Sequence, residues 1–263
     1  MYIGISVLLS NIEEGLRLCR DNPIITHIEV GIDNLNDCEK LQIYKGEIDN
    51  LNLSMGIHLP LELNTCENVE FIRDSWIDFV SIVCNKLKDF NIKYYNLHLG
   101  YARSKILKGY LTNYLNNAVE FFDKLSLRDD TKNEIFTLEN TYSKGGDIYC
   151  IGNNMEIFRY IFNNSMNKNL YFCYDSGHDL INRSDYFSLS DKFNVIHLSN
   201  NYGKEDEHLG LSNGLLSDCM IKKMINSNAE ILVLEMNLDE VKNSISYLEK
   251  TYLEKTYLEE TLF

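Results

Sequence analysis

Tyr95-Asn96-Leu97-His98 is a short, mainly apolar run that ends in a histidine, and the same arrangement recurs along this chain. Further runs of this kind end in a histidine or a carboxylate, at His58, Glu139, Asp175, His197 and Glu235. Runs that are nearly continuous in apolar character are typical of parallel strands covered on both faces. The recurrence therefore predicts a parallel sheet in which most strands present a metal-seeking side chain at the same end.

The chain contains eight strand-like runs, and together they predict the fold. Their starts are spaced roughly 23 to 40 residues apart, which leaves room for one helix and two loops in each interval. Eight alternating β and α units predict an α/β protein with a single (β/α)8 TIM barrel. An open, doubly wound sheet is the alternative, but its site would gather at one switch point, whereas here six different strands end in ligand-type residues. The predicted strands are residues 2–7, 27–32, 55–59, 94–99, 134–139, 170–175, 193–198 and 230–235.

Helical patterns fill the intervals between these strands. Residues 69–88 and 110–126 carry apolar residues at helical spacing, with Glu and Lys between them. The stretch from Ser10 to Glu13 is typical of a capping box that opens the first helix, because each of the two side chains can bond to the backbone of the other. The interval after His178 is the shortest, so we expect its helix to be abbreviated.

Nothing in the sequence divides residues 1–263 into separate domains, so we expect one. Only two prolines occur, Pro23 and Pro60, and no linker rich in glycine and serine interrupts the chain. A repeat of Tyr-Leu-Glu-Lys-Thr occupies about residues 247–263. A five-residue period drifts around a helix and cannot form one apolar stripe. We interpret this tail as a helical extension of the last helix, and a contact in a homo-oligomer is the alternative.

Composition and charge disfavour several classes of protein. The chain has 25 basic and 39 acidic residues and a net charge of −14, which disfavours nucleic acid as a partner because phosphates are neutralised by Lys and Arg. No apolar stretch approaches about 18 residues, so we expect no membrane span. The seven cysteines are scattered and never spaced as Cys-x-x-Cys, which favours a reduced, cytoplasmic setting.

Imidazoles and carboxylates at the ends of predicted strands indicate a metal site. Such ligands suit Zn²⁺, Mn²⁺ or Fe²⁺, and the lack of thiolate in the set excludes a structural zinc site. Any one of these histidines alone would more often be a hydrogen-bonded core residue. Nine ligand-type residues on one rim make that interpretation improbable for all of them together. His27 is the contrast, because it lies at the start of its strand, on the opposite rim, and is expected to be structural.

The order and spacing of these motifs resemble a known family. They are similar to the xylose isomerase-like TIM barrels, the superfamily of sugar isomerases and epimerases that also contains endonuclease IV (AP endonuclease family 2). The resemblance covers essentially the whole barrel. It rests on Gly56-Ile57-His58-Leu59-Pro60, Asn96-Leu97-His98-Leu99-Gly100, Leu138-Glu139-Asn140-Thr141 with Gly145-Gly146, Asp175-Ser176-Gly177-His178, His197-Leu198-Ser199-Asn200, Asp206-Glu207-His208 with Gly210, and Leu234-Glu235.

The resemblance implies a ligand set and the role of two glutamates. It implies one to three divalent ions per chain, Zn²⁺ or Mn²⁺, with Glu139 and Glu235 as the catalytic acid/base pair. The metal core shared by the isomerases and the endonuclease would comprise Glu139, Asp175, His197 and Glu235. The further ligands of the three-ion cluster of the endonuclease would be His58, His98, His178, Asp206 and His208.

Two positions depart from the endonuclease pattern. Leu61 stands where endonuclease IV has an aromatic residue that grips DNA, and Asn200 stands in place of an aspartate. These departures disfavour a DNA-repair role and leave the predicted metal site intact. A local basic cluster of Arg103, Lys105 and Lys108 could bind a substrate phosphate, Arg as a fork and Lys as a point charge. The alternative interpretation of the cluster is the solvated start of a helix.

Three functions remain open from the sequence, and we favour the first. It is a metal-dependent sugar or sugar-phosphate isomerase or epimerase, in which Glu139 and Glu235 move a proton beside a metal-bound substrate. The second is an endonuclease IV-like phosphodiesterase with three ions, acting on abasic DNA or a phosphorylated small molecule, where Glu139 would bridge two ions. The third is a metal-binding scaffold without turnover, and the intact carboxylates argue against it.

Overall fold

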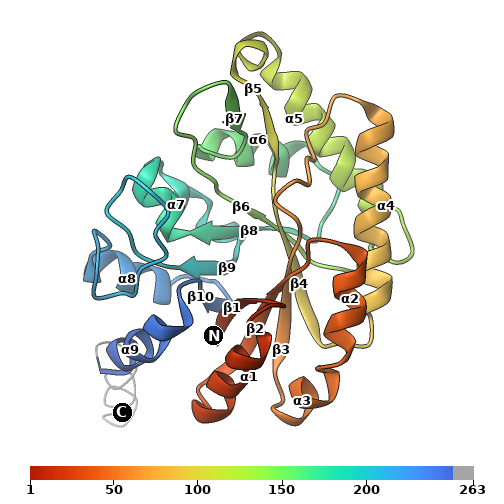
Figure 1. The fold of residues 1–263 in the computed structure, drawn as a ribbon. Helices are drawn as coiled ribbons and strands as arrows, with labels where there is room; N and C mark the ends of the chain where they lie inside the picture. Colours follow the sequence, from red (N-terminus) through yellow and green to blue (C-terminus); the bar gives the residue numbers. More distant parts are fainter. Residues whose placement is uncertain (251–263) are drawn as a thin grey trace, which may run out of the picture.

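The computed structural model describes residues 1–250, and eight parallel strands close into a barrel within it (Figure 1). The predicted (β/α)8 TIM barrel is confirmed, and each strand boundary lies within two residues of its prediction. The barrel strands are β1 (Tyr2–Leu8), β2 (Ile25–Gly31), β3 (Ser54–His58), β4 (Ile92–His98), β6 (Phe136–Glu139), β8 (Leu170–Asp175), β9 (Phe193–Leu198) and β10 (Ile231–Leu234). Around the ring they follow the order β1, β10, β9, β8, β6, β4, β3, β2.

The register of the strands brings their carboxyl ends to one edge of the barrel. Strand β4 pairs with β6 so that His98 lies opposite Glu139, and β8 pairs with β9 so that Asp175 lies opposite His197. The ring closes where β1 pairs with β10. The carboxyl ends of a closed parallel barrel surround one mouth, so residues that are far apart in the sequence meet there.

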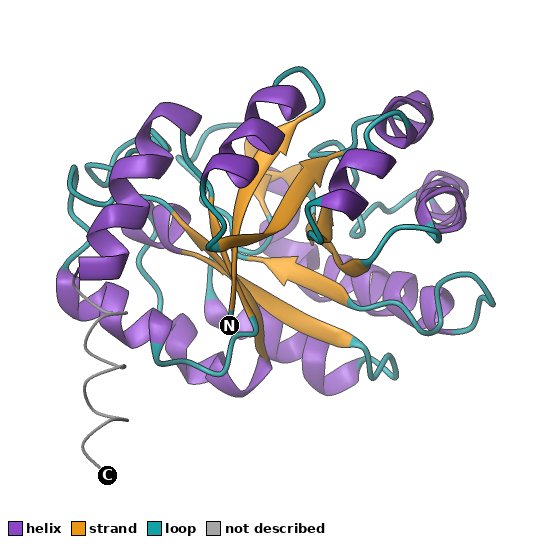
Figure 2. Ribbon diagram, turned by 90° about the horizontal axis from the view of Figure 1, so that it is seen from below, coloured by secondary structure: helices purple, strands orange, loops and turns teal. Residues whose placement is uncertain are grey.

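Helices surround the strands on the outside (Figure 2). The two long helices predicted from periodicity are present as α4 (Glu70–Leu87) and α5 (Ser104–Ser126), although α5 begins earlier than expected. Helix α7 (Ser176–Ile181) has only 6 residues, which confirms the expected abbreviation. The remaining helices are α1 (Ile12–Asp21), α2 (Leu35–Gln42), α3 (Lys45–Asn50), α6 (Met155–Asn164), α8 (Asp218–Ile225) and α9 (Leu238–Leu248), with a 3₁₀ segment η1 (Tyr186–Lys192).

The predicted capping box at the first helix is wrong. Ser10 lies outside α1, whose N-cap is Asn11 and whose cap has no side-chain hydrogen bond. The Asn11 side chain instead accepts a hydrogen bond from the backbone N–H of Leu8, 2.8 Å away, and so closes the preceding turn. Asn and Ser are both good capping residues, and the turn geometry decides which of two neighbours occupies the cap. A capping box does occur one helix later, between Asn34 and Asp37 at the start of α2.

The barrel encloses a buried polar network in addition to its apolar core. His27, Glu29 and Tyr94 have no exposed surface. The Tyr94 hydroxyl donates to Glu29 Oε2 at 2.7 Å and lies 3.3 Å from His27 Nε2. Gly56 leaves space for this tyrosine, because a Cβ there would lie 2.8 Å from Tyr94 Cε2 and closer still to its hydroxyl. The hydrogen bonds among these groups offset part of the cost of burying them, while Glu29 Oε1 is buried without a partner.

A small antiparallel sheet, which the sequence analysis missed, stands on the ligand-bearing side of the barrel. Its strands are β5 (Tyr101–Arg103) and β7 (Ile148–Cys150). They lie in the segments that follow β4 and β6, and Figure 1 shows them together at the top of the view. Strands of three residues carry too few positions to produce a recognisable alternation.

The C-terminal tail is described only in part. Helix α9 ends at Leu248, inside the tail predicted at about 247–263, and residues 251–263 lie outside the described residues. The helical extension and the oligomer contact therefore stay predictions, as does the assignment of residues 1–263 to one domain. Within residues 1–250, no helix combines the length and the apolar character needed to cross a membrane.

Candidate metal centre

The predicted ligands lie at the carboxyl ends of the barrel strands, as expected. His58, His98, Glu139 and Asp175 are each the last residue of a strand, in β3, β4, β6 and β8. His197 is the next-to-last residue of β9, and Glu235 follows β10 directly. His178 lies in α7, and Asp206 and His208 lie in the long loop after β9. That loop is held to the barrel by a two-way backbone bridge between Asn200 and Leu209.

Glu139 is the hub of the site. Its side chain is 1% exposed, and histidine nitrogens from four different segments surround it. His58 Nε2 lies 3.3 Å from Oε2, and His98 Nε2 lies 3.2 Å from Oε1. His178 Nδ1 and His197 Nδ1 each lie 3.3 Å from one of the two oxygens. A carboxylate with imidazoles on both oxygens can bridge two cations.

Among the described residues, three sets of potential ligand atoms lie within 4.8 Å of one another. All three sets share Glu139, and two of them correspond to the predicted core and to one predicted additional ion. The third set replaces Asp175 and Glu235 with the buried thiol of Cys173, which the sequence analysis did not include. The sets are His58, His98 and Glu139; Glu139, Asp175, His197 and Glu235; and Glu139, Cys173 and His197.

The predicted ligands of a third ion also lie near one another, but farther apart than the three sets above. They are His178, Asp206 and His208. Asp206 Oδ2 lies 3.1 Å from His178 Nε2 and 3.2 Å from His208 Nε2. The three are not among the sets of described residues whose ligand atoms all lie within 4.8 Å of one another. His208 has a φ of 48°, a backbone conformation that is uncommon outside glycine.

Four of the five predicted histidine ligands have one ring nitrogen committed to a partner outside the cluster. His58 Nδ1, His178 Nδ1 and His208 Nδ1 bond to the backbone carbonyls of Leu59, Asn140 and Glu235, at 2.8 to 2.9 Å. A carbonyl only accepts, so these nitrogens carry the proton. Nε2 of each of the three rings faces a carboxylate, and His178 Nδ1 also lies 3.3 Å from Glu139 Oε1. His197 has the reverse orientation, with Nε2 on Glu29 Oε2 at 2.9 Å and Nδ1 in the cluster. Such bonds orient metal-binding imidazoles.

Several atoms of the predicted ligands have no hydrogen-bond partner, and a bound cation would provide one. Asp175 Oδ2, His197 Nδ1, Asp206 Oδ1 and Glu235 Oε2 are buried without a hydrogen bond. His197 Nδ1 and Glu235 Oε2 lie 2.9 Å apart and still do not satisfy each other. Buried unsatisfied polar atoms are costly and rare in native proteins. Two carboxylates and an imidazole that converge in this way suit Zn²⁺ or Mn²⁺.

The carboxylates of the site have divergent pKa values. Burial alone would raise the pKa of Glu139, but nearby histidines, His98 and His197 first among them, hold it well below its usual range. Burial raises the pKa of Asp175 well above its usual range, and neighbouring carboxylates add to the effect against the opposing charge of His178. Burial, reinforced by neighbouring carboxylates, therefore keeps Asp175 from ionising readily, and a divalent cation would favour its charged form.

Negative charge around the site holds four of its five histidines toward their protonated form, whereas burial lowers the pKa of His98. Burial would lower the pKa of His58, but its hydrogen bond to Glu139 and the surrounding negative charge raise it to about 9. The hydrogen bond to Asp206 raises the pKa of His208 to about 9 as well, in spite of burial. Metal binding must displace these protons, so the affinity of the site for metal depends on pH.

Arg103 and Lys105, the predicted substrate contacts, lie at the edge of this arrangement. Arg103 ends β5 and Lys105 is in the first turn of α5, and both side chains are exposed. Neither forms an ion pair with another described residue. Their segment stands on the mouth side of the barrel (Figure 1). Nothing in their surroundings holds them toward the carboxylates.

Two polar residues in contact with the ligands were missed. Glu29 is fully buried in β2 and bonds to His197, and Asn96 in β4 donates to Glu139 Oε2. The available signal was a polar residue inside an apolar strand, as in Ile28-Glu29-Val30. His27, predicted to be structural, bonds to Ser54 at 2.9 Å, and burial lowers its pKa to about 3.

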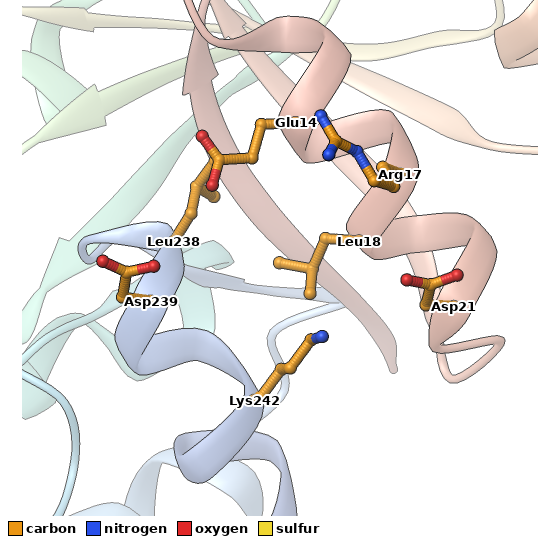
Figure 3. A pocket seen from close by; sticks show the side chains of 7 residues that line it. All are labelled: Glu14, Arg17, Leu18, Asp21, Leu238, Asp239 and Lys242. Carbon is orange, nitrogen blue, oxygen red and sulfur yellow. The ribbon is translucent and has the colours of Figure 1, made fainter.

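A pocket on the outside of the barrel is separate from the centre. It lies between α1 and α9 and has a volume of about 230 Å³ (Figure 3). Side chains from the two helices face each other across it, with Leu18 and Leu238 among several charged groups. None of the predicted ligands lines it. Its mixed charges do not single out one kind of ligand.

Comparisons with known proteins agree with the fold. Residues 26–251 match the family described as xylose isomerase-like TIM barrel. The uncharacterized protein MJ1614 of Methanocaldococcus jannaschii is 25% identical over 263 residues, covering 95% of this chain and 99% of that protein. A D-tagatose 3-epimerase-like protein has a similar structure, with a TM-score of 0.82, 18% identity and 100% of both chains covered. Endonuclease IV from Thermus thermophilus has a TM-score of 0.62 at 15% identity, covering 97% of this chain and 100% of its own.

Proposed function

This chain belongs to the xylose isomerase-like TIM barrel family, and on that basis we propose that it is a divalent-metal-dependent isomerase or epimerase of a sugar or sugar phosphate. The observation that carries the proposal is the approach of Glu139 and Glu235 to the same atom. His197 Nδ1 lies 3.3 Å from Glu139 Oε2 and 2.9 Å from Glu235 Oε2. Two carboxylates beside one point can remove a proton from a substrate carbon and return it.

The residues around that point suggest separate roles for the metal ion and the two glutamates. A divalent ion held by Glu139, Asp175, His197 and Glu235 would bind adjacent substrate oxygens and stabilise the negative charge that develops on them. Burial would raise the pKa values of both glutamates, but nearby histidines hold them below the usual range, so both are carboxylates at neutral pH. One of the two would accept the proton from a substrate carbon and then, as the protonated acid, donate it to the neighbouring carbon, which completes an isomerisation. Glu235, at 19% exposed, is the more accessible of the two.

The residues at the mouth of the barrel favour a small substrate over DNA. Leu61, which stands where endonuclease IV grips DNA, is 61% exposed and offers no ring for stacking. Asn200 is buried and accepts from the backbone of Leu216, so it supports a loop. The net charge of −14 also disfavours nucleic acid. The exposed Arg103 and Lys105 remain our candidates for contact with a substrate phosphate, and the free cysteines favour a cytoplasmic setting.

A second candidate is a phosphodiesterase with three ions. The position of Asp206 between His178 and His208 favours it, because an isomerase that uses one ion needs no such group. All nine ligand positions of the endonuclease pattern are filled in this chain. A phosphorylated small molecule would reconcile these ligands with the acidic surface.

Solvent exchange distinguishes the candidates. We expect the protein loaded with Mn²⁺ to incorporate deuterium from D₂O next to the carbonyl group of at least one member of a panel of ketoses, aldoses and their phosphates. Glu139→Gln should show no exchange, and Glu156→Gln, which alters an exposed carboxylate on α6, should match the wild type. Hydrolysis of phosphodiesters without exchange would replace the proposal with the second candidate. A metal-loaded protein inactive in both assays would indicate a scaffold.

A further inference from the structure

Among the described residues, the buried carboxylate of Glu29 bonds to one predicted ligand of the metal centre, His197. Glu29 lies in the middle of β2, inside the barrel, and both its side chain and that of His197 are 0% exposed. His197 Nε2 lies 2.9 Å from Glu29 Oε2, while His197 Nδ1 lies 2.9 Å from Glu235 Oε2 and 3.3 Å from Glu139 Oε2. One imidazole therefore separates Glu29 from the two catalytic glutamates.

We propose that Glu29 is a positioning residue for His197: its carboxylate holds the Nε2–H of the ring and so directs Nδ1 at the metal. The inference rests on the proposed metal-dependent function. A carboxylate is an acceptor only, so a hydrogen bond to it fixes the proton on Nε2 and leaves the lone pair on Nδ1. It also makes the imidazole a more basic, stronger ligand.

His197 differs in this respect from the other histidine ligands. His58, His178 and His208 each bond to a backbone carbonyl, which orients the ring with a neutral acceptor. Only His197, among the predicted ligands, bonds to a carboxylate outside the cluster. His197 also belongs to the set with Glu139, Asp175 and Glu235. The only charged acceptor among these bonds thus holds a predicted ligand of the ion on which the proposed proton transfer depends.

Glu29 is itself held in place by a second hydrogen bond to the oxygen that contacts His197. The Tyr94 hydroxyl donates to the same oxygen, Oε2, at 2.7 Å and is followed by His27 at 3.3 Å. The aromatic ring of Tyr94 fits only because Gly56 has no side chain. A buried carboxylate needs such bonds, and shared hydrogen bonds in a low dielectric reinforce one another. Tyr94 therefore supports Glu29 but does not touch His197.

The test compares Mn²⁺ affinity in the full-length wild type, Glu29→Gln, Glu29→Asp and Tyr94→Phe, by calorimetric titration, with folding checked by circular dichroism. We expect about 10- to 100-fold weaker binding for Glu29→Gln. Glu29→Asp, which withdraws the carboxylate from His197, should also bind Mn²⁺ more weakly. It replaces Glu29→Gln in the comparison if that variant does not fold. Tyr94→Phe removes a bond to the same oxygen and keeps the bond to His197, so its loss of affinity should be clearly smaller.

The outcomes separate this inference from the function on which it rests. A visible absorption spectrum of the Co²⁺-loaded protein that changes in Glu29→Gln and persists in Tyr94→Phe would support a role at the metal. A purely structural role would lower the denaturation midpoints of both variants and leave Mn²⁺ affinity and the Co²⁺ spectrum unchanged, and this result overturns the inference alone. A wild type that binds no metal overturns the proposed function and the inference together.

Discussion

Gly56→Ala should destabilise the protein strongly, because the new methyl group would collide with Tyr94. The Cβ would lie 2.8 Å from Tyr94 Cε2, and closer to Cζ and the hydroxyl, where ordinary carbon contacts are about 3.5–4.0 Å. Overpacking of this kind costs about 1–3 kcal/mol. If the ring moves, the buried bond from its hydroxyl to Glu29 is lost as well, which adds about 1.5–3 kcal/mol because the acceptor is a carboxylate.

The expected loss is therefore about 2.5–6 kcal/mol in the free energy of unfolding, measured by urea denaturation. Gly46→Ala is the matched control, since Gly46 lies in α3 with nothing within 4 Å of its Cβ position. That change should stabilise the protein by up to about 1 kcal/mol, as alanine favours helix over glycine. A Gly56→Ala protein within about 1 kcal/mol of the wild type would show that Tyr94 does not occupy the barrel as described.

Three further predictions concern protonation and the ligand set. Mn²⁺ affinity should rise as the pH increases from 7 toward 9, because His58 and His208, each with a pKa of about 9, must lose a proton to bind metal; a calorimetric titration that shows no proton release would contradict this. His27 has a pKa of about 3 in the folded state against 6.5 when exposed, so the unfolded state binds its proton at a higher pH than the folded state does. The free energy of unfolding should therefore fall by about 4–5 kcal/mol in total as the pH drops from 6.5 to 3. In His27→Gln, the free energy of unfolding should fall less steeply over the same pH range. His208→Ala should keep most of the activity of an isomerase with one essential ion, whereas a loss of nearly all activity in a steady-state assay would favour the three-ion phosphodiesterase.

The barrel could be predicted from the sequence because its strands are buried on both faces. Each strand is then a compact apolar run, as at 170–175 and 193–198, where prediction and structure coincide. The candidate ligands could be proposed for a related reason. In a parallel barrel a polar residue at the end of such a run lies at the mouth, so position along the strand is sufficient to place it.

The features that were missed depend on contacts between strands. Glu29 lies in the interior of β2, and its role depends on His197, 168 residues later in the chain. Periodicity gives no information about such a partner. The capping box failed for a local reason: Asn11, next to Ser10, occupies the cap because its side chain already closes a turn with Leu8. The pairing of β5 with β7 joins two three-residue segments and leaves no pattern in either.

Metal content per chain tests the central claim most directly. Elemental analysis should be made on protein purified without chelators and without a metal-binding tag, and repeated after loading with Zn²⁺ or Mn²⁺. The account predicts at least one tightly bound divalent ion per chain, lost in His197→Ala, because the unsatisfied atoms of Asp175, His197 and Glu235 converge on one point. A ratio near three would favour the phosphodiesterase. Protein that retains no divalent ion, even after loading, would contradict the metal centre and the function built on it.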